Sequence, residues 1–267
     1  MKPESEMDTS HAADAPPFLS VVIPVYNEAR RLAQTLQTVA AYLARQSYTS
    51  ELIVVDDGST DRSAEIVESF CATHPCVKLI RNDHRGKGFA VRTGMLAGRG
   101  RIVLFMDADL ATPVEETGRL LPWFEQGYDI VIGSRALAGG RDVTRRFHRR
   151  VMGVVYNWLV RLLTVHGIRD TQCGFKAFRR EVIRELFARS RLYGPDAPTI
   201  KGAMVTGFDV ELLFLAQKAG YRIKEMPVDW HHRGETSVHP LRDPWRCFCD
   251  AVRVWWNNLR GRYDSRT

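Results

Sequence analysis

Short apolar runs alternate with longer segments through the first half of the chain, and the two kinds of segment differ in periodicity. Five nearly continuous apolar runs predict strands, at residues 19–24, 51–57, 77–80, 102–106 and 129–133. The segments between them carry apolar residues at helical spacing, as in Leu32, Leu36, Val39, Ala40 and Leu43. Strands that alternate with helices predict right-handed βαβ units and a mostly parallel sheet flanked by helices, an α/β fold.

Polar residues between these runs predict where helices begin. The first helix is expected from about Glu28 and the third from about Gly88. A serine, threonine or aspartate at 59–61 is available to cap the second. Thr112 and Pro113 predict a further helix, with the threonine as N-cap and the proline as its first residue.

The second half of the chain is less regular. We expect a helix over 151–165, a polar loop over 170–178 that leads to a strand, a loop over 192–207, a helix over 208–220, a strand over 221–230 and an amphipathic helix over 244–263. Phe208, Leu212, Leu215 and Ala216 should face inward. The expected organisation is a disordered polar tail over 1–17, a folded domain over 18–240 and a C-terminal amphipathic helix with its tail over 241–267.

A polar cluster follows each of the five expected strands of the first half. The clusters are PVYNE (24–28), DDGSTD (56–61), DHRGKG (83–88), DAD (107–109) and GSR (133–135). Ligands of open parallel sheets bind beyond the carboxyl ends of the strands. The five clusters are therefore expected to meet at one site.

The DAD cluster indicates a metal site. On a regular strand Asp107 and Asp109 would point the same way and repel each other. Two carboxylates without nearby histidine or cysteine suit a hard divalent cation, Mg2+ or Mn2+, which completes its coordination with phosphate oxygens and water. Turns also carry aspartate pairs, and it is the neighbouring clusters that favour the metal interpretation.

The other clusters suit a nucleotide. Asp57 can accept from a base or a ribose hydroxyl, although it could instead cap the next helix. Tyr26 could form a wall for the base, and Glu28 could accept from the sugar, or the segment could be an ordinary turn. Lys87 could reach a phosphate or remain solvated. The P-loop spacing is not present around it.

Charge and composition narrow the class of partner. The chain has 267 residues and a net charge of +7. Its basic residues concentrate beside one local acid, Asp142, at Arg135, Arg141, Arg145, Arg146, Arg149 and Arg150. This concentration favours an anionic partner over a generally basic surface. The sequence shows no signal peptide and no apolar run long enough to span a membrane. The five cysteines include no zinc-type pair, so the expected compartment is the reducing cytoplasm.

The clusters, in this order, resemble the family 2 glycosyltransferases, which have the GT-A fold. The matching segments are PVYNE, VVDDGSTD, HRGKGFAVRTGM, FMDADLATP, DIVIGSR, DTQCGFKAF and GFDVELL. They extend from about Leu19 to Arg246. Within the family the chain looks most like polyprenyl- and dolichyl-phosphate sugar synthases, and DTQCGFK with the segment 208–230 is closest to dolichyl-phosphate β-glucosyltransferases.

The resemblance implies roles for particular residues. The nucleoside would be held by Pro24, Tyr26, Glu28, Val55 and Asp57. The metal and diphosphate would be bound by Asp107, Ala108 and Asp109, with Lys87 as a further donor-site candidate. Arg135 would contact a phosphate as part of the catalytic set with Asp107 and Asp109, and the acceptor phosphate would meet Arg135, Arg149 and Arg233.

Three positions depart from the family pattern. Ala111 replaces a glutamine of mannosyl members, which puts mannose specificity in doubt. Gly174 stands where bactoprenol-type glucosyltransferases have an aspartate, so no catalytic base is carried over there. Ser237 replaces a common lysine, and that phosphate contact could pass to Arg233 or Arg242.

The missing base favours a phosphate acceptor. A phosphomonoester has a second pKa near 6 and is already a nucleophilic dianion at pH 7. It needs positioning and charge neutralisation more than deprotonation. A sugar hydroxyl would need a base, with Asp170, Asp209 and Glu211 as candidates.

The expected reaction is therefore inverting, metal-dependent transfer of a hexose, glucose from UDP-glucose, to a polyprenyl or dolichyl phosphate. The alternatives are transfer to a hydroxyl of a glycan or glycoside, and mannosyl transfer from GDP-mannose. Basic and aromatic residues on the helices from about 145 and 244 suit peripheral attachment to the inner face of a membrane, or packing on the domain. Nucleic acid is not expected as a partner, because the basic run lacks a stacking pattern of aromatics.

Overall fold

The computed structural model describes residues 15–137, 164–202, 207–231 and 242–264. Most of the expected tail and of the helix over 151–165 lies outside these residues. Arg149, Arg233 and Ser237 also lie outside them. The proposed acceptor contacts of both arginines are therefore expectations from the resemblance alone.

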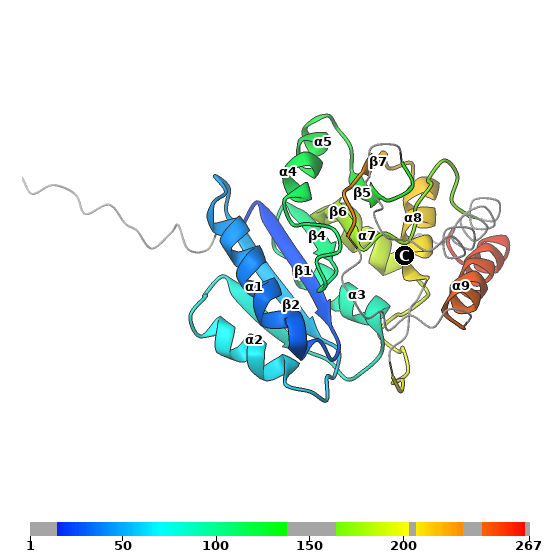
Figure 1. The fold of residues 1–267 in the computed structure, drawn as a ribbon. Coiled ribbons are helices and arrows are strands. Elements are labelled where there is room, and N and C mark those ends of the chain that lie inside the picture. Colours follow the sequence, from blue (N-terminus) through cyan, green and yellow to red (C-terminus); the bar gives the residue numbers. More distant parts are fainter. Residues whose placement is uncertain (1–14, 138–163, 203–206, 232–241, 265–267) are drawn as a thin grey trace, which may run out of the picture.

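A seven-stranded sheet forms the centre of the described structure, in the order β3-β2-β1-β4-β6-β5-β7 (Figure 1). The strands are β1 (Leu19–Val25), β2 (Ser50–Asp56), β3 (Val77–Arg81), β4 (Ile102–Met106), β5 (Ile130–Ser134), β6 (Phe175–Arg179) and β7 (Ile223–Pro227). β6 is antiparallel to both of its neighbours, and the remaining pairs are parallel. The expectation of a mostly parallel α/β sheet is confirmed.

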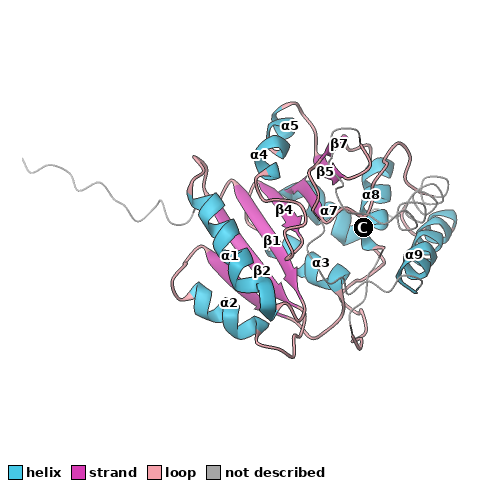
Figure 2. Cartoon of the chain, in the orientation of Figure 1, coloured by secondary structure: helices cyan, strands magenta, loops and turns pink. Residues whose placement is uncertain are grey.

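Helices cover both faces of this sheet (Figure 2). They are α1 (Ala29–Ala44), α2 (Ser63–Cys71), α3 (Lys87–Ala97), α4 (Glu116–Leu120), α5 (Pro122–Glu125), α7 (Arg180–Arg189), α8 (Phe208–Lys218) and α9 (Arg242–Leu259). Among the described residues, no helix is both long enough and apolar enough to cross a membrane.

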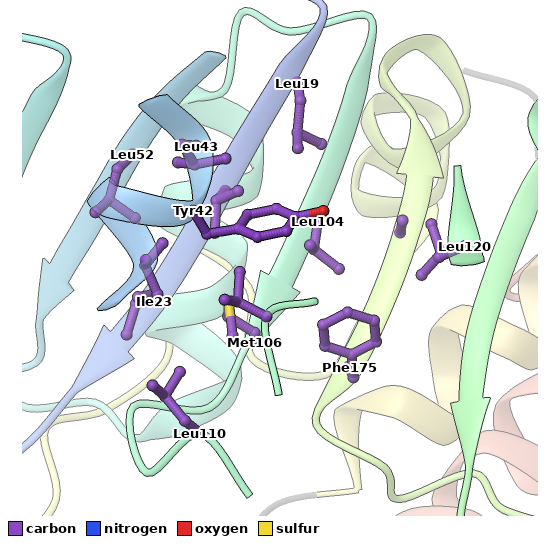
Figure 3. Packing of buried hydrophobic residues seen from close by; sticks show 14 of the residues in the cluster. Leu19, Ile23, Tyr42, Leu43, Leu52, Leu104, Met106, Leu110, Leu120 and Phe175 are labelled. Carbon is purple, nitrogen blue, oxygen red and sulfur yellow. The ribbon is translucent and has the colours of Figure 1, made fainter. Parts of the chain in front are cut away.

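Two apolar cores result, one on each face, because successive residues of a strand point to opposite sides. On β1, Val21 and Ile23 belong to the core shared with α1, while Val22 belongs to the core shared with α3, α7 and α8. Figure 3 shows part of the first core, where Tyr42 of α1 and Leu104 of β4 are buried together. All four residues expected to face inward on α8 are buried.

The helix expected at Thr112 and Pro113 begins later, so that prediction is wrong. α4 starts at Glu116, whose amide donates to Pro113 O across a turn (3.1 Å). The carbonyl of Ala111, just before Thr112, accepts from His231 N (2.8 Å), and this bond joins the segment to the residues after β7. The Thr112 hydroxyl lies 4.0 Å from Cys173 Sγ instead of capping a helix.

A buried carboxylate on α8 fastens two distant segments. Glu211 accepts from the amides of Arg191 (2.7 Å) and Leu192 (3.0 Å), and from the hydroxyl of Tyr263 (2.7 Å). Burial raises the pKa of Glu211 to about 7, although these hydrogen bonds oppose the shift. Glu211 therefore holds the start of the 191–202 loop, and Tyr263 in the segment after α9, against α8.

This raised pKa predicts a stability that falls as pH rises. The folded protein retains a proton on Glu211 that the unfolded chain releases near 4.5, so the contribution is complete below about pH 4.5 and is lost as pH passes 7. We expect Glu211→Gln to remove this part of the pH dependence. Between pH 5.5 and pH 8 the expected loss of unfolding free energy is about 2 kcal/mol, because the pH interval from 5.5 to the folded pKa contributes about 1.4 kcal/mol per pH unit.

Urea unfolding at pH 5.5 and pH 8 measures the effect. The parent should lose more unfolding free energy between the two values than the variant. Equal losses in the two proteins would show that Glu211 does not titrate in this range.

Candidate active site

The carboxyl ends of the parallel strands bring the predicted clusters together. Lys87, from the cluster after β3, places its Nζ 2.5 Å from Asp107 Oδ1, after β4. Burial raises the pKa of Glu28, after β1, and the charges of Asp109 and Asp107 add to the shift while Arg31 opposes it. Asp57, after β2, binds the segment after β3 (below). The residues after β1 and β3 therefore interact with the aspartates after β4, and Asp57 joins the end of β2 to the segment after β3.

The chain turns at the two aspartates, so they do not follow strand geometry. Asp107 O accepts from Leu110 N (3.2 Å), and Leu110 has a positive φ of 50°. Asp109 Oδ1 accepts from Ala111 N (2.9 Å). Burial raises the pKa of Asp109, and the charge of Asp107 raises it further. The two carboxylates therefore repel each other, and Lys87 lies beside Asp107, where its charge offsets part of this repulsion.

Gly174 provides the space for Asp107. A Cβ at Gly174 would lie 2.0 Å from Asp107 Oδ2, and the Gly174 carbonyl accepts from Asp107 N (3.1 Å). This proximity arises because β6 runs antiparallel to β4, with Phe175 paired to Met106. A side chain at position 174 would displace the Asp107 carboxylate.

Arg135 is engaged by an acid of the DTQCGFK segment. Its Nε and Nη2 donate to the two oxygens of Asp170 (2.7 and 2.8 Å), and its backbone amide donates to the same carboxylate (3.0 Å). Burial alone would raise the pKa of Asp170, but the guanidinium of Arg135 holds it well below its usual range. Asp170 is thus a structural counter-ion and not a base. Two N–H groups of Arg135, which the resemblance assigns to a phosphate, already donate to Asp170.

A second buried pair stands behind the first. Lys176 Nζ lies 3.1 Å from Asp209 Oδ1, with both side chains almost fully buried, and it also contacts Cys173 O. Burial raises the pKa of Asp209, and Lys176 opposes this. Sequence reasoning missed Lys176, and a lysine between the apolar residues Phe175 and Ala177 was the available signal.

Asp57 is held by the segment that follows β3. Its carboxylate accepts from the amides of Arg85 (3.1 Å) and Gly86 (2.8 Å), and lies 2.7 Å from His84 Nδ1. Burial raises its pKa in spite of these contacts. It does not cap α2, where Asp61 Oδ1 accepts from Ser63 N (2.9 Å).

The Tyr26 ring has a partner that sequence reasoning missed. His84 stacks on it with ring centroids 3.8 Å apart and 2° between the planes. The other predicted donor residues lie at the same edge. Pro24 pairs in register with Val55, and the Ala108 carbonyl accepts from the hydroxyl of Thr35 (2.7 Å).

A loop was expected over 192–207, and the described residues 191–202 make contacts that the sequence did not predict. Ile200 N donates to His84 O (2.9 Å), and Arg85 Nη1 donates to Pro195 O (2.7 Å). His84 Nε2 lies 3.0 Å from Gly202 O. The loop therefore joins the residues that hold Asp57.

The pair of Arg135 and Asp170 predicts a large stability effect. Asp170→Asn leaves a buried guanidinium without its counter-charge, and we expect the free energy of unfolding to fall by about 3 kcal/mol. Urea denaturation measures it. The matched control is Glu68→Gln, which removes an exposed pair with Arg81 and should cost less than about 1 kcal/mol. Equal losses in the two variants would contradict a structural role for the buried pair.

Comparisons with known proteins agree with this geometry. The family model for glycosyl transferase family 2 matches residues 20–187. A dolichyl-phosphate beta-glucosyltransferase of Drosophila melanogaster is 36% identical over 264 residues, covering 92% of this chain and 76% of that protein. One from Trichomonas vaginalis is 36% identical over 233 residues, covering 83% of this chain and 66% of that protein, so the chain spans about two thirds of its length.

Among solved structures, glucosyl-3-phosphoglycerate synthase from Mycobacterium tuberculosis, in complex with Mn2+, UDP and glucosyl-3-phosphoglycerate, superposes with a TM-score of 0.61. The match covers 100% of this chain and 87% of that one at 20% identity, which supports the GT-A fold. With the family model matched over most of the sheet and its strand ends, the chain belongs to glycosyl transferase family 2 and is a glycosyltransferase.

Proposed function

We propose that this enzyme transfers a hexose, glucose from UDP-glucose, to a polyprenyl or dolichyl phosphate with inversion. The observation that carries the choice of acceptor is that all three candidate bases are engaged. Asp170 is paired with Arg135, Asp209 with Lys176, and Glu211 is bound by two amides and Tyr263. A hydroxyl acceptor would need such a base, whereas a phosphate dianion does not.

The reaction then needs no proton transfer. An oxygen of the acceptor phosphate forms a bond to C1 of the hexose from the face opposite the leaving group. The bond from C1 to the β-phosphate oxygen of UDP breaks, and its electron pair leaves with UDP. The product is a β-linked lipid-phosphate sugar.

The donor would occupy the edge formed by β1, β2 and β4. Tyr26, Pro24, Glu28, Val55 and Asp57 are the proposed nucleoside residues. Because His84 stacks on Tyr26, a base that binds against that ring face has to displace the imidazole. Lys87, already beside Asp107, is placed to meet the diphosphate.

The site fits a divalent cation whose coordination is completed by oxygens of the substrate. Asp107 and Asp109 supply hard oxygen ligands, and Mg2+ or Mn2+ commonly binds one or two carboxylates together with phosphate oxygens and water. No group of three or more metal-ligating side chains occurs within the described residues, which fits this division of ligands between protein and substrate. When bound, such an ion neutralises charge on the departing nucleoside diphosphate.

A transfer assay tests the proposal, with UDP-glucose, Mn2+ and a short-chain polyprenyl phosphate, reading UDP release and lipid product together. We expect a lipid-linked glucose. Asp109→Ala should lower kcat at least about 100-fold while the circular dichroism spectrum is retained, because charge stabilisation at the leaving group is lost. Glu65→Gln, an exposed acid on α2, is the matched control and should leave kcat unchanged.

Other results would redirect the assignment. UDP release without lipid product would move the acceptor to a hydroxyl, and activity with GDP-mannose alone would change the donor. Full activity of Asp109→Ala would contradict the proposed metal site.

We also propose that the enzyme binds the cytoplasmic face of an anionic membrane through the outer face of α9. The large hydrophobic side chains that are exposed among the described residues all lie on α9 and its end, at Trp245, Trp255, Trp256 and Leu259. The opposite face of the same helix, with Ala251 and Val254, is buried in the core. Tryptophan together with flanking arginine suits a bilayer interface.

Vesicle co-sedimentation checks this surface. Trp255→Ala with Trp256→Ala should weaken binding to vesicles containing phosphatidylglycerol by about tenfold, from the loss of buried aromatic area. Trp123→Tyr, beyond this helix, serves as the control. Unchanged binding in the double variant would exclude this face, and concentration-dependent dimerisation lost in that variant would assign it to a second copy instead.

A further inference from the structure

A cavity of about 670 Å³ lies between the 191–200 loop and the first half of α9. One part of its wall is apolar, formed by Leu192, Tyr193, Pro198, Ile200 and Trp245. Trp245 stands at its opening, since 65% of this residue is exposed. The cavity therefore opens next to the outer face of α9.

The rest of the wall is strongly basic. Arg85, Arg191, Arg246 and Arg253 all line it. A wall with both apolar and cationic parts suits an amphiphile that carries an anion, because each part of the ligand finds its own counterpart.

Acidic residues of the wall offset only part of this charge. Asp250 already accepts from the Tyr193 hydroxyl (2.6 Å) and Gly207 N (2.9 Å), and lies 3.4 Å from Arg253 Nη1. Asp196 is exposed to solvent. Arg246 thus retains its charge for a ligand.

Arg246 also has an unsatisfied donor. Its Nη1 atom is buried and has no hydrogen-bond partner. Leaving a buried donor of a charged group unpaired is costly, and an anion in the cavity would remove that cost. Arg135, in contrast, already donates to Asp170 through Nε and Nη2.

Arg85 is one of the residues that connect the cavity to the donor edge. The Arg85 backbone amide donates to Asp57 Oδ1 (3.1 Å), while its guanidinium donates to Pro195 O (2.7 Å) in the loop. A ligand in the cavity is therefore beside the segment that holds the proposed nucleoside residue.

We infer that this cavity binds the acceptor, a phosphomonoester on an apolar prenyl chain, with the phosphate at Arg246 and the first prenyl units against Ile200 and Trp245. This assignment rests on the proposed function. It makes Arg246 an acceptor-binding residue that neither the motifs nor the expected arginines at 135, 149 and 233 identify.

Direct binding to the full chain tests the inference without requiring turnover. Isothermal titration with citronellyl phosphate should give a Kd at least about tenfold higher for Arg246→Gln than for the parent, as expected for loss of a charge-assisted hydrogen bond. Arg260→Gln, directly after the last residue of α9 and outside the cavity, is the matched control and should leave this Kd unchanged. The Kd for UDP with Mn2+ should be the same in all three proteins.

Further ligands identify what the cavity recognises. Citronellol and inorganic phosphate should each bind far more weakly than citronellyl phosphate. Phosphatidylglycerol vesicles that compete for Arg246 as strongly as citronellyl phosphate does would overturn the acceptor assignment in favour of a membrane headgroup site. An Arg246→Gln protein with the parent's Kd for citronellyl phosphate would overturn the site altogether.

A second variant protects the test if Arg246→Gln does not fold. Ala197→Trp fills the cavity from the loop and should weaken citronellyl phosphate binding by a similar factor. Unchanged binding in a folded Ala197→Trp protein would overturn the inference.

Turnover distinguishes the assignment of the cavity from the proposed function. Transfer to lipid phosphate with an unchanged acceptor KM in Arg246→Gln would exclude the cavity and leave the proposed function standing. Binding that depends on Arg246, without transfer to any lipid phosphate, would retain the cavity as a site and overturn the proposed function.

Discussion

Negative charge collected at the ends of parallel strands has to be balanced, and the cations that balance it organise this site. Lys87 meets Asp107, Arg135 meets Asp170, and Lys176 meets Asp209. The last two pairs are buried, where an unpaired charge would be strongly destabilising. Each pair also joins residues from different segments of the chain, so the contacts that neutralise charge also hold these segments together.

The antiparallel strand β6 is the element through which this balance is reached. It lies between β4 and β5, and so brings the DTQCGFK segment to the edge where the parallel strands end. Gly174, just before β6, leaves room for the Asp107 carboxylate. Asp170 forms an ion pair with Arg135, and Lys176 forms one with Asp209. A substitution in this short segment would therefore disturb the donor edge without touching a ligand.

Ion pairing within the protein distinguishes charged residues that support the site from charged residues that are available to bind a ligand. Acids that resemble bases in the sequence are committed to cations or amides, which favours an acceptor that arrives already ionised. Arginines divide in the same way. Arg135 is used within the protein, and Arg246 keeps an unpaired buried donor in a cavity wall. The 191–202 loop connects the two regions because it contacts both His84 and α9.

The sequence by itself determined the five strands of the first half, the three helices between the first four of them, the mostly parallel sheet and the family, but it assigned the residues of β6 to a loop and did not predict α7. The correct predictions follow from hydrophobic periodicity and from the rule that parallel strands end at one edge, both of which are readable locally. Only the tertiary structure decided that Asp170 pairs with Arg135, that His84 stacks on Tyr26, that Thr112 does not start a helix and that the buried Nη1 atom of Arg246 has no hydrogen-bond partner. Those outcomes depend on contacts between residues tens of positions apart, which no local pattern specifies.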